Sequence, residues 1–406
     1  MRWTPRPVTR LNGTLLTIIA LLAALAPFAT DVYLPTFPAM AEQLGTSATG
    51  VQVTLTAFLI GAGAGQLFFG PLSDRIGRRV PLIVGTAVCV VAGLGAVLAQ
   101  NLVVLVVARL VQGLSGSAGM VLGRAIISDV AKGREAARAF NLTSIVLGIA
   151  PVAAPLVGAV FAKALGWRGL LGIVVGLSLV TLVAVIIFVP ETHPATARAA
   201  QRQAHTNSQS SGLGSRAYLG NMLVLVFGFG AMMAYISASP FVYQVMIGMN
   251  ELTYGIVFGA TALMITFVSY LSARLTRRVR THVLLRTGVC ILVGSGVVLA
   301  TFAISPLPSW CLVIPLVTGI SSMGLIFGNA TALALGAVPH AIGTASALMG
   351  AAQFLLGAGV APLVGLAGNH SAVPMATVFG ISALLALAAF LSARNARVQN
   401  RGAPER

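Results

Sequence analysis

The sequence predicts an all-α integral membrane protein, with roughly twelve transmembrane helices in two pseudo-symmetric six-helix bundles. Three observations lead to this fold class. The 406 residues are 57% hydrophobic and only 8% charged, which is about a third of the charged fraction of an average soluble domain. Stretches such as residues 172–189 are apolar on every side of a helix, whereas a soluble helix shows only a stripe. Apolar runs of about 20 residues, enough to cross a hydrocarbon core of roughly 30 Å, recur along the chain.

Each apolar run is expected to be a helix, because a strand edge cannot be left unpaired in lipid. In the first half the expected spans are residues 12–35, 51–71, 80–99, 102–125, 141–163 and 168–189. In the second half they are residues 218–241, 251–273, 284–304, 309–331, 344–366 and 373–393. The longest polar stretch lies between the halves and predicts a flexible linker. The expected domains are therefore a bundle over 1–190, a cytoplasmic linker over 191–217, a bundle over 218–393 and a cytoplasmic tail over 394–406.

Arginine and lysine fall in every second connector, while the opposite connectors hold only Lys163 and Arg168. The positive-inside rule therefore predicts a multi-pass protein of the inner or plasma membrane with both termini cytoplasmic. The first span is expected to be retained, because it is too long for a signal peptide and lacks a small-x-small cleavage site. The net charge of +17 is dispersed over short loops, which favours anionic lipid over nucleic acid as the partner.

Several enzyme classes are not indicated by the sequence. Lys132 and Lys163 are the only lysines, and neither follows the spacing of a phosphate-binding P-loop. Cys89, Cys290 and Cys311 stand singly in predicted spans, and the histidines fall in predicted loops, so no disulfide, metal site or hydrolase arrangement is expected. We expect a monomeric, non-enzymatic protein without a cofactor, whose partners are a small molecule, membrane lipid and a proton.

Asp31 is the only carboxylate expected inside a span, since the other acids map to loops, helix ends or the tail. An ionisable group at membrane depth costs a few kcal/mol and so needs a reason. Arg109 is expected at a similar depth in the fourth span, as a partner of Asp31. One interpretation is a static salt bridge that orients helices. We favour a proton switch, because burial raises the pKa of a carboxyl group, a nearby arginine lowers it, and changing access alters both effects.

The connector between the second and third spans reads Gly70-Pro-Leu-Ser-Asp74-Arg75-Ile-Gly77-Arg78-Arg79. It closely resembles the signature loop of the major facilitator superfamily. That resemblance implies a contact of Asp74 with the positive N-terminus of the eleventh helix, near Gly343 and Thr344, and a contact of Arg75 with Asp129. It also implies a latch of the outward-facing state formed by Gly70, Asp74, Arg75, Gly77, Arg78, Arg79 and Asp129.

Other motifs narrow the resemblance. Arg109-Leu-Val-Gln112-Gly113 looks like the fourth-helix motif of that family, and the fifth span resembles its antiporter motif at Gly148, Pro151, Pro155 and Gly158. Close packing or a kink explains these glycines and prolines equally well. Thr30-Asp31-Val-Tyr33-Leu-Pro35 and Pro190-Glu191-Thr192 look like the Bcr/CflA branch of drug:proton antiporters, which includes bicyclomycin and chloramphenicol or florfenicol exporters. Residues 272–281 resemble a decayed copy of the first loop, with its cations but without its aspartate and glycines.

The resemblance implies proton-driven multidrug efflux, and hence antibiotic resistance, through alternating access to a site near mid-membrane. Some related exporters carry a second acid two turns before the first, where this chain has Ala23, so neutral or zwitterionic cargo is favoured. Simple packing explains each cargo-site candidate as well as binding does: Phe28, Thr30, Asp31, Tyr33, Phe58, Met232, Met233, Tyr235 and Ile236. The alternatives are a proton symporter or metabolite exporter of the same fold, or a non-transporting membrane sensor.

Overall fold

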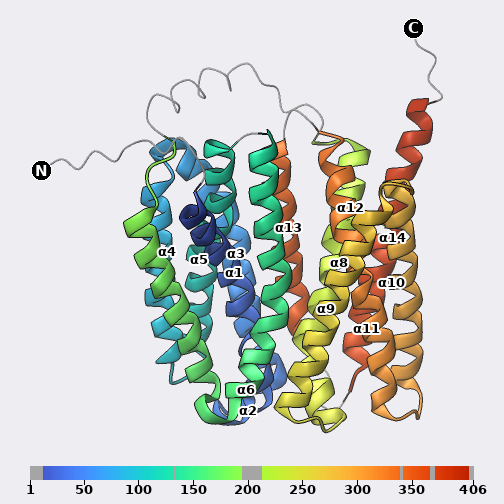
Figure 1. Ribbon diagram of the computed structural model, residues 1–406. Helices are drawn as coiled ribbons and strands as arrows, with labels where there is room; N and C mark the ends of the chain where they lie inside the picture. Colours follow the sequence, from blue (N-terminus) through green and yellow to red (C-terminus); the bar gives the residue numbers. More distant parts are fainter. Residues whose placement is uncertain (1–11, 132, 194–212, 339–341, 366–370, 402–406) are drawn as a thin grey trace, which may run out of the picture. The chain divides into compact units, whose positions relative to one another are not determined.

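The computed structural model describes residues 12–131, 133–193, 213–338, 342–365 and 371–401, and the regular elements among them are helices (Figure 1). Eleven stretches of these described residues are long and apolar enough to cross a membrane. One of them, Arg138–Phe188, has 51 residues, or about 77 Å of helix, which is more than twice the thickness of a hydrocarbon core. It makes two crossings, so the all-helical membrane fold with its twelve spans is confirmed.

The double crossing is divided at a glycine. Gly166 has φ 59° and ψ −176° inside the element α6 (Gly133–Phe188), a left-handed φ that glycine adopts without the steric cost of a side chain. The indole nitrogen of Trp167, the next residue, donates a hydrogen bond of 2.9 Å to the side-chain oxygen of Gln43. The break lies between the expected spans 141–163 and 168–189, so the turn between them falls where the sequence predicted it.

The first compact unit contains Met1–Leu44 and Ala57–Gln209. Its elements are α1 (Gly13–Asp31), a short 3-10 turn (Leu34–Thr36), α2 (Phe37–Gln43), most of α3 (Ala48–Ile76), α4 (Arg79–Val97), α5 (Leu102–Val130) and α6. Asn12 and Asn101 begin α1 and α5 by accepting hydrogen bonds from backbone N–H groups of the first turn, as N-cap residues do. The core of this unit is a cluster of buried side chains that includes Leu22 of α1 and Leu122 and Ile126 of α5.

The second compact unit contains Gly45–Thr56 and Ser210–Arg406, so the start of α3 packs with it. Its other elements are α8 (Arg216–Pro240), a π-helical turn (Phe241–Met246), α9 (Glu251–Leu275), α10 (Thr281–Ile304), a 3-10 turn (Ser309–Leu312), α11 (Val313–Ser321), α12 (Met323–Leu335), α13 (Ile342–Leu363) and α14 (Val373–Arg401). The expected span 309–331 is interrupted at Ser322, between α11 and α12. Much of the expected linker, residues 194–212, lies outside the described residues, so its boundaries stay a prediction.

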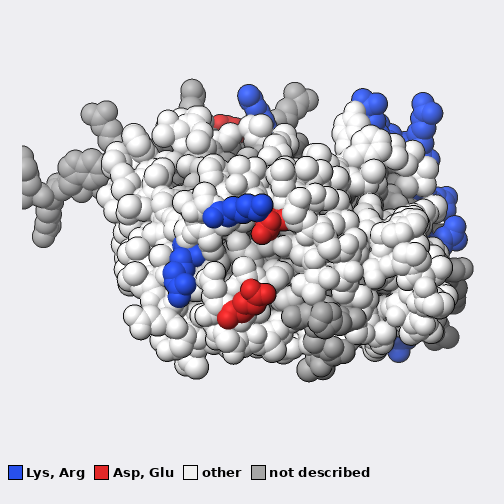
Figure 2. Space-filling view, turned by 90° about the horizontal axis from the view of Figure 1, so that it is seen from below, with Lys and Arg blue, Asp and Glu red and all other residues white. Residues whose placement is uncertain are grey.

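Apolar side chains cover much of the outer surface. On α4, Val80, Val84, Val88 and Val91 recur at helical spacing, and all four are exposed. Figure 2, which looks at the ends of the helices, shows a few scattered charged side chains among uncharged residues. A soluble monomer rarely exposes such continuous apolar surface, whereas lipid covers it without cost.

Candidate functional site

Arg109 is the centre of the candidate site in the first unit, and it is fully buried in α5. Its guanidinium donates hydrogen bonds to the side-chain oxygen of Gln112 (2.7 Å), the carbonyl oxygen of Ala29 (2.7 Å) and the hydroxyl of Tyr33 (3.3 Å). The ring centroids of Tyr33 and Phe58 lie 4.9 and 4.6 Å from its Cζ atom, within the range of cation–π attraction. The buried charge is thus compensated by oxygens and two ring faces.

Asp31, the last residue of α1, is only 4% exposed. The expected pair with Arg109 is wrong as a direct contact, because the ion pairs among the described residues do not include these two side chains. Arg109 instead binds a carbonyl in the last turn of α1, where helix ends leave carbonyl oxygens free. Since Ala29 precedes Asp31 by two residues and Tyr33 follows it by two, Arg109 holds the chain on both sides of Asp31.

Gly158 of α6 packs against the same corner of α1. A Cβ atom at this position would overlap the carbonyl oxygen of Val32, the residue after Asp31. Only glycine allows this close approach of two backbones. Pro151 and Pro155 lie earlier in the same helix, together with Gly148. The segment expected to be an antiporter motif therefore contacts the backbone next to Asp31 through its last member.

The three remaining cargo candidates of the first unit differ in exposure. Phe28 is half-buried, and the Thr30 hydroxyl donates to the carbonyl oxygens of Ala26 and Pro27, each at 3.1 Å. Phe58 is 2% exposed and lies beside Arg109. The structure thus brings Tyr33 and Phe58 against one arginine, which binds the chain two residues before and two residues after Asp31, and it leaves Phe28 more accessible.

The cargo candidates of the second unit pack with other side chains of that unit. Tyr235 stacks on Phe258 with ring centroids 5.3 Å apart, and Tyr243 meets Tyr235 edge-on at 6.3 Å. Close neighbours of Met233 include the backbone of Gly357. Met232 is half-buried and Ile236 is 8% exposed. Tyr235 is therefore packed against other aromatic rings of its unit, which agrees with a role in helix packing at least as well as with cargo binding.

The turn between α3 and α4 is held by charged side chains. Gly77 has φ 102°, so the chain reverses there at a position that favours glycine. Arg78 then binds Asp74 at 2.6 Å and Asp129 of α5 at 3.0 Å. Burial lowers the pKa of Arg78, but the hydrogen bonds and charges of Asp129 and Asp74 more than offset this, so its pKa is raised above the ordinary value.

This pairing corrects the expected contact between Arg75 and Asp129. Asp129 accepts hydrogen bonds from Arg78 and, at 3.2 Å, from the Thr192 hydroxyl, while Arg75 is exposed. The left-handed residue Gly77 reverses the chain between the two arginines, so that Arg78 and not Arg75 points back toward α5. Gly70 is half-buried in α3, and the Ser73 hydroxyl donates to its carbonyl oxygen. The expected contact of Asp74 with Gly343 and Thr344 joins the two units and stays a prediction.

Glu191 completes this turn, although the sequence had marked it only as part of a family motif. Its two carboxylate oxygens accept hydrogen bonds from the backbone N–H groups of Arg78 (2.9 Å), Arg79 (3.1 Å) and His193 (2.8 Å). Arg79 also donates to the carbonyl oxygen of Ile186 at 2.9 Å. A carboxylate at the start of a helix satisfies free N–H groups and the positive end of the helix dipole. An acid directly after an apolar span was the available signal for this role.

Comparison with known proteins supports a transporter. The family model of the Major Facilitator Superfamily matches residues 19–362. An uncharacterized MFS-type transporter of Bacillus subtilis is 35% identical over 94% of this chain and 95% of its own length. A bicyclomycin resistance protein homolog of Haemophilus influenzae is 30% identical over 93% of this chain and 96% of its own. The xylose transporter XylE from E. coli, in a partially occluded inward-open conformation, matches with a TM-score of 0.72 at 15% identity, over 93% of this chain and 96% of that one.

Proposed function

The chain belongs to the Major Facilitator Superfamily of membrane transporters, and we propose that it is a proton-driven antiporter that exports small amphiphilic, neutral or zwitterionic compounds, antibiotics among them. It is related to proteins named for drug resistance, such as the bicyclomycin resistance homolog. The export of drugs by this chain is the step that the proposal adds. Cytoplasmic termini, a location in the inner membrane and a monomeric state belong to the same proposal.

The geometry of Asp31 carries the proposal. A buried carboxylate with no ion-pair partner among the described residues is costly at membrane depth, so a change in its solvent access changes how readily it holds a proton. Arg109 and Gly158 fix the backbone on either side of it. A movement of α1 against α5 or α6 would therefore change the surroundings of Asp31 directly.

One proton-binding carboxyl suffices for the energetics of export. A charge moving through a membrane potential of 100 mV releases about 2.3 kcal/mol. That free energy supports roughly fiftyfold accumulation of a neutral compound against its gradient. Each transport cycle would load one proton on Asp31 from one side and release it on the other, while the cargo moves in the opposite direction.

The latch is the second part of the proposal. The turn formed by Asp74, Gly77, Arg78 and Asp129, with Glu191 beneath it, is a rigid charged element in the first unit. We propose that this turn stabilises the outward-facing state through Asp74. The exposed Asp74 carboxylate, whose side chain is 47% accessible, can still meet another positive group such as a helix N-terminus.

Asp31→Asn tests the proton-coupling step. The change preserves size and removes the proton-binding group, so drug-induced proton release in everted vesicles should be abolished while expression and thermal unfolding stay near wild type. Glu42→Gln is the matched control, because Glu42 is an exposed acid of α2 in the same unit, and its proton release should be unchanged. Undiminished proton release by the Asp31→Asn variant would contradict the proposal.

The same vesicles decide between export and the symport alternative. With an inward-acid gradient imposed on everted vesicles, an antiporter accumulates drug inside, because protons leave as drug enters. A symporter would lose preloaded solute together with protons. Saturable binding with no flux in either direction would instead indicate a sensor.

A further inference from the structure

The turn between α9 and α10 carries three arginines that the transport proposal does not use. Arg274 lies in the last turn of α9, Arg277 and Arg278 follow it, and all three are exposed. The N–H groups of Arg277 and Arg278 donate to carbonyl oxygens three residues earlier, so the chain continues here as a helical turn. Residues three and four positions apart lie on the same side of such a turn. These three residues therefore form one arginine cluster.

The second unit has almost no acid to pair with the arginine cluster. Between Glu251 and Glu405 the sequence contains no aspartate or glutamate, and Glu405 lies outside the described residues. Glu251 is at the opposite end of α9, about 35 Å from Arg274 along the helix axis. Charges that far apart are screened, since the Debye length is about 8 Å at physiological ionic strength. The ion pairs found among the described residues do not include the cluster, so its negative partner comes from outside this unit.

An exposed apolar stripe on α9 leads directly to the arginine cluster. Its members recur at helical spacing and are each more than half exposed: Ile256, Leu263, Phe267 and Tyr270. The Cζ atom of Arg274 lies 4.9 Å from the centroid of the Tyr270 ring, within the range of cation–π attraction. The first charge of the cluster therefore lies against the last ring of this α9 stripe.

The α9 stripe points away from the rest of the second unit. On the opposite side of α9, a Cβ atom at Gly324 of α12 would overlap the backbone of Ile265 and Ser269, so that side is packed against α12. Residues two positions apart on a helix point in very different directions. Phe267 lies between these two packed residues in the sequence and is 59% exposed. In a membrane, the face that carries the stripe is covered by acyl chains.

The arrangement of the charges and the stripe defines the partner. Arginine binds phosphate oxygens with parallel N–H donors. A free phosphate, a nucleic acid or an acidic peptide would meet the arginines but would leave the apolar stripe uncovered. A phospholipid has an anionic phosphate at the end of an acyl chain, so one molecule contacts both surfaces at once.

We propose that the α9–α10 turn is a binding site for an anionic phospholipid, whose phosphate is held by the arginine cluster and whose acyl chain lies along the α9 stripe. The Tyr270 ring holds the guanidinium of Arg274, which lowers the cost of ordering this side chain when the lipid binds. The inference depends on the membrane location of the chain and is independent of drug export.

Lipid titrations of the purified full-length protein in detergent, followed by native mass spectrometry, test the site. The wild-type protein should bind the first molecule of phosphatidylglycerol more tightly than phosphatidylcholine with the same acyl chains, whose choline cation offsets the phosphate charge. An arginine near an anionic surface contributes about 1 kcal/mol, or roughly fivefold in the dissociation constant. Arg274→Gln should therefore lower the preference for phosphatidylglycerol roughly fivefold. Replacing all three arginines of the cluster by glutamine should remove the preference.

Arg286→Gln is the matched control, because Arg286 is also exposed but belongs to α10. It should keep the wild-type preference for phosphatidylglycerol. Phe267→Ser tests the other half of the site, since it keeps every charge and removes one ring of the α9 stripe. It should weaken both lipids by a similar factor and leave the preference unchanged. The substituted side chains are exposed, and thermal unfolding checks that each variant is folded.

Equal binding of the two lipids by the wild type would overturn the site, as would an unchanged preference in the triple arginine variant. An equal loss in Arg286→Gln would also overturn it, because the charge would then act from the whole end of the unit. Unchanged affinities in Phe267→Ser, or full displacement of phosphatidylglycerol by an equal concentration of inorganic phosphate, would rule out a lipid as the occupant. These measurements use neither drug nor proton gradient, so they stand or fall separately from the Asp31→Asn experiment.

Discussion

The α3–α4 turn and the α9–α10 turn have similar basic sequences but opposite surroundings. In the first, Arg78 is 8% exposed at its side chain and pairs with two aspartates. In the second, the arginines are exposed, and the ion pairs found among the described residues do not include them: Arg274, Arg277, Arg278, Arg280 and Arg286. Arg274 instead lies over the ring of Tyr270, with its Cζ atom 4.9 Å from the centroid.

Both turns carry arginines, so the difference shows that the nearby acids decide whether such a turn is held by ion pairs. Asp74, Asp129 and Glu191 convert the positive charge of the first turn into fixed hydrogen bonds. In the second turn the charge stays at the surface, where anionic lipid headgroups attract it. The first turn therefore has the fixed hydrogen bonds that the proposed latch requires, whereas the second leaves its arginines exposed.

The largest expected effect comes from Asp129→Asn, which would break the first turn. Asn removes one of the two negative charges that Arg78 faces, and Asp74 keeps the other, so the protein should lose about 2 kcal/mol of stability. Thermal unfolding in detergent measures this loss, and drug efflux should fall with it. Arg75→Gln is the control, since Arg75 is exposed. If Asp129→Asn and Arg75→Gln both unfold at the wild-type temperature, the ion pairs do not stabilise the first turn more than the second.

A smaller effect is expected from Glu191→Gln. This variant tests the acid that binds the backbone of the turn separately from Asp129, which binds the Arg78 side chain. The amide keeps one acceptor oxygen, while the carboxylate accepts three backbone hydrogen bonds through two. The loss should be about 1 kcal/mol, again by thermal unfolding. Glu251→Gln in the first turn of α9 is a matched control. A loss equal to that of Asp129→Asn would mean that both acids act as a single unit.

The smallest effect on stability is expected in the second turn. The double variant Arg277→Gln with Arg278→Gln should change stability by less than about 0.5 kcal/mol, because both side chains are exposed. Each arginine near an anionic surface contributes about 1 kcal/mol of attraction. The amount of anionic lipid that co-purifies with the protein, measured by mass spectrometry, should therefore fall. Unchanged lipid content together with lower stability would reverse the assignment of the two turns.

Composition and apolar run length predicted the fold, because insertion into lipid depends on hydrophobicity summed over about 20 neighbouring residues. The break at Gly166 falls between two expected spans for the same reason. The interruption of the expected span 309–331 at Ser322 was missed, because a local bend of a buried helix leaves its apolar composition unchanged. The short helix α2 was likewise read as a loop.

The candidate site was predicted in part. Burial of Asp31 and Arg109 followed from their positions in apolar runs, but their direct pairing did not form. Arg109 and its acceptor Ala29 are 80 residues apart, and the direction of a guanidinium over that separation depends on how α1 packs on α5. The same limit applies to Arg78, which took the place of Arg75 because Gly77 turns the chain between them.

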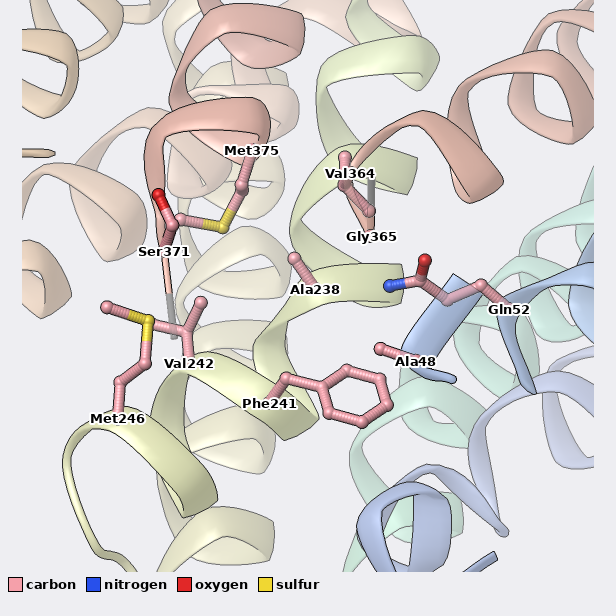
Figure 3. Close-up of a pocket in the computed structure, with 10 residues that line it drawn as sticks. All are labelled: Ala48, Gln52, Ala238, Phe241, Val242, Met246, Val364, Gly365, Ser371 and Met375. Atoms are coloured by element: carbon pink, nitrogen blue, oxygen red, sulfur yellow. The ribbon is translucent and has the colours of Figure 1, made fainter. Parts of the chain in front are cut away.

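The sequence by itself determined a polytopic helical membrane protein with one buried acid, one buried arginine and a charged turn, since each of these follows from local hydrophobicity and motif. Only the tertiary structure decided which oxygens Arg109 binds, which arginine meets Asp129, and that Glu191 holds the start of α4. It also decided that the nitrogen of Gln52 binds the carbonyl oxygen of Ser237, 185 residues away, while the buried oxygen of Gln52 has no hydrogen-bond partner among the described residues (Figure 3). Such choices depend on side-chain directions between helices far apart in the chain, and neither spacing nor composition encodes those directions.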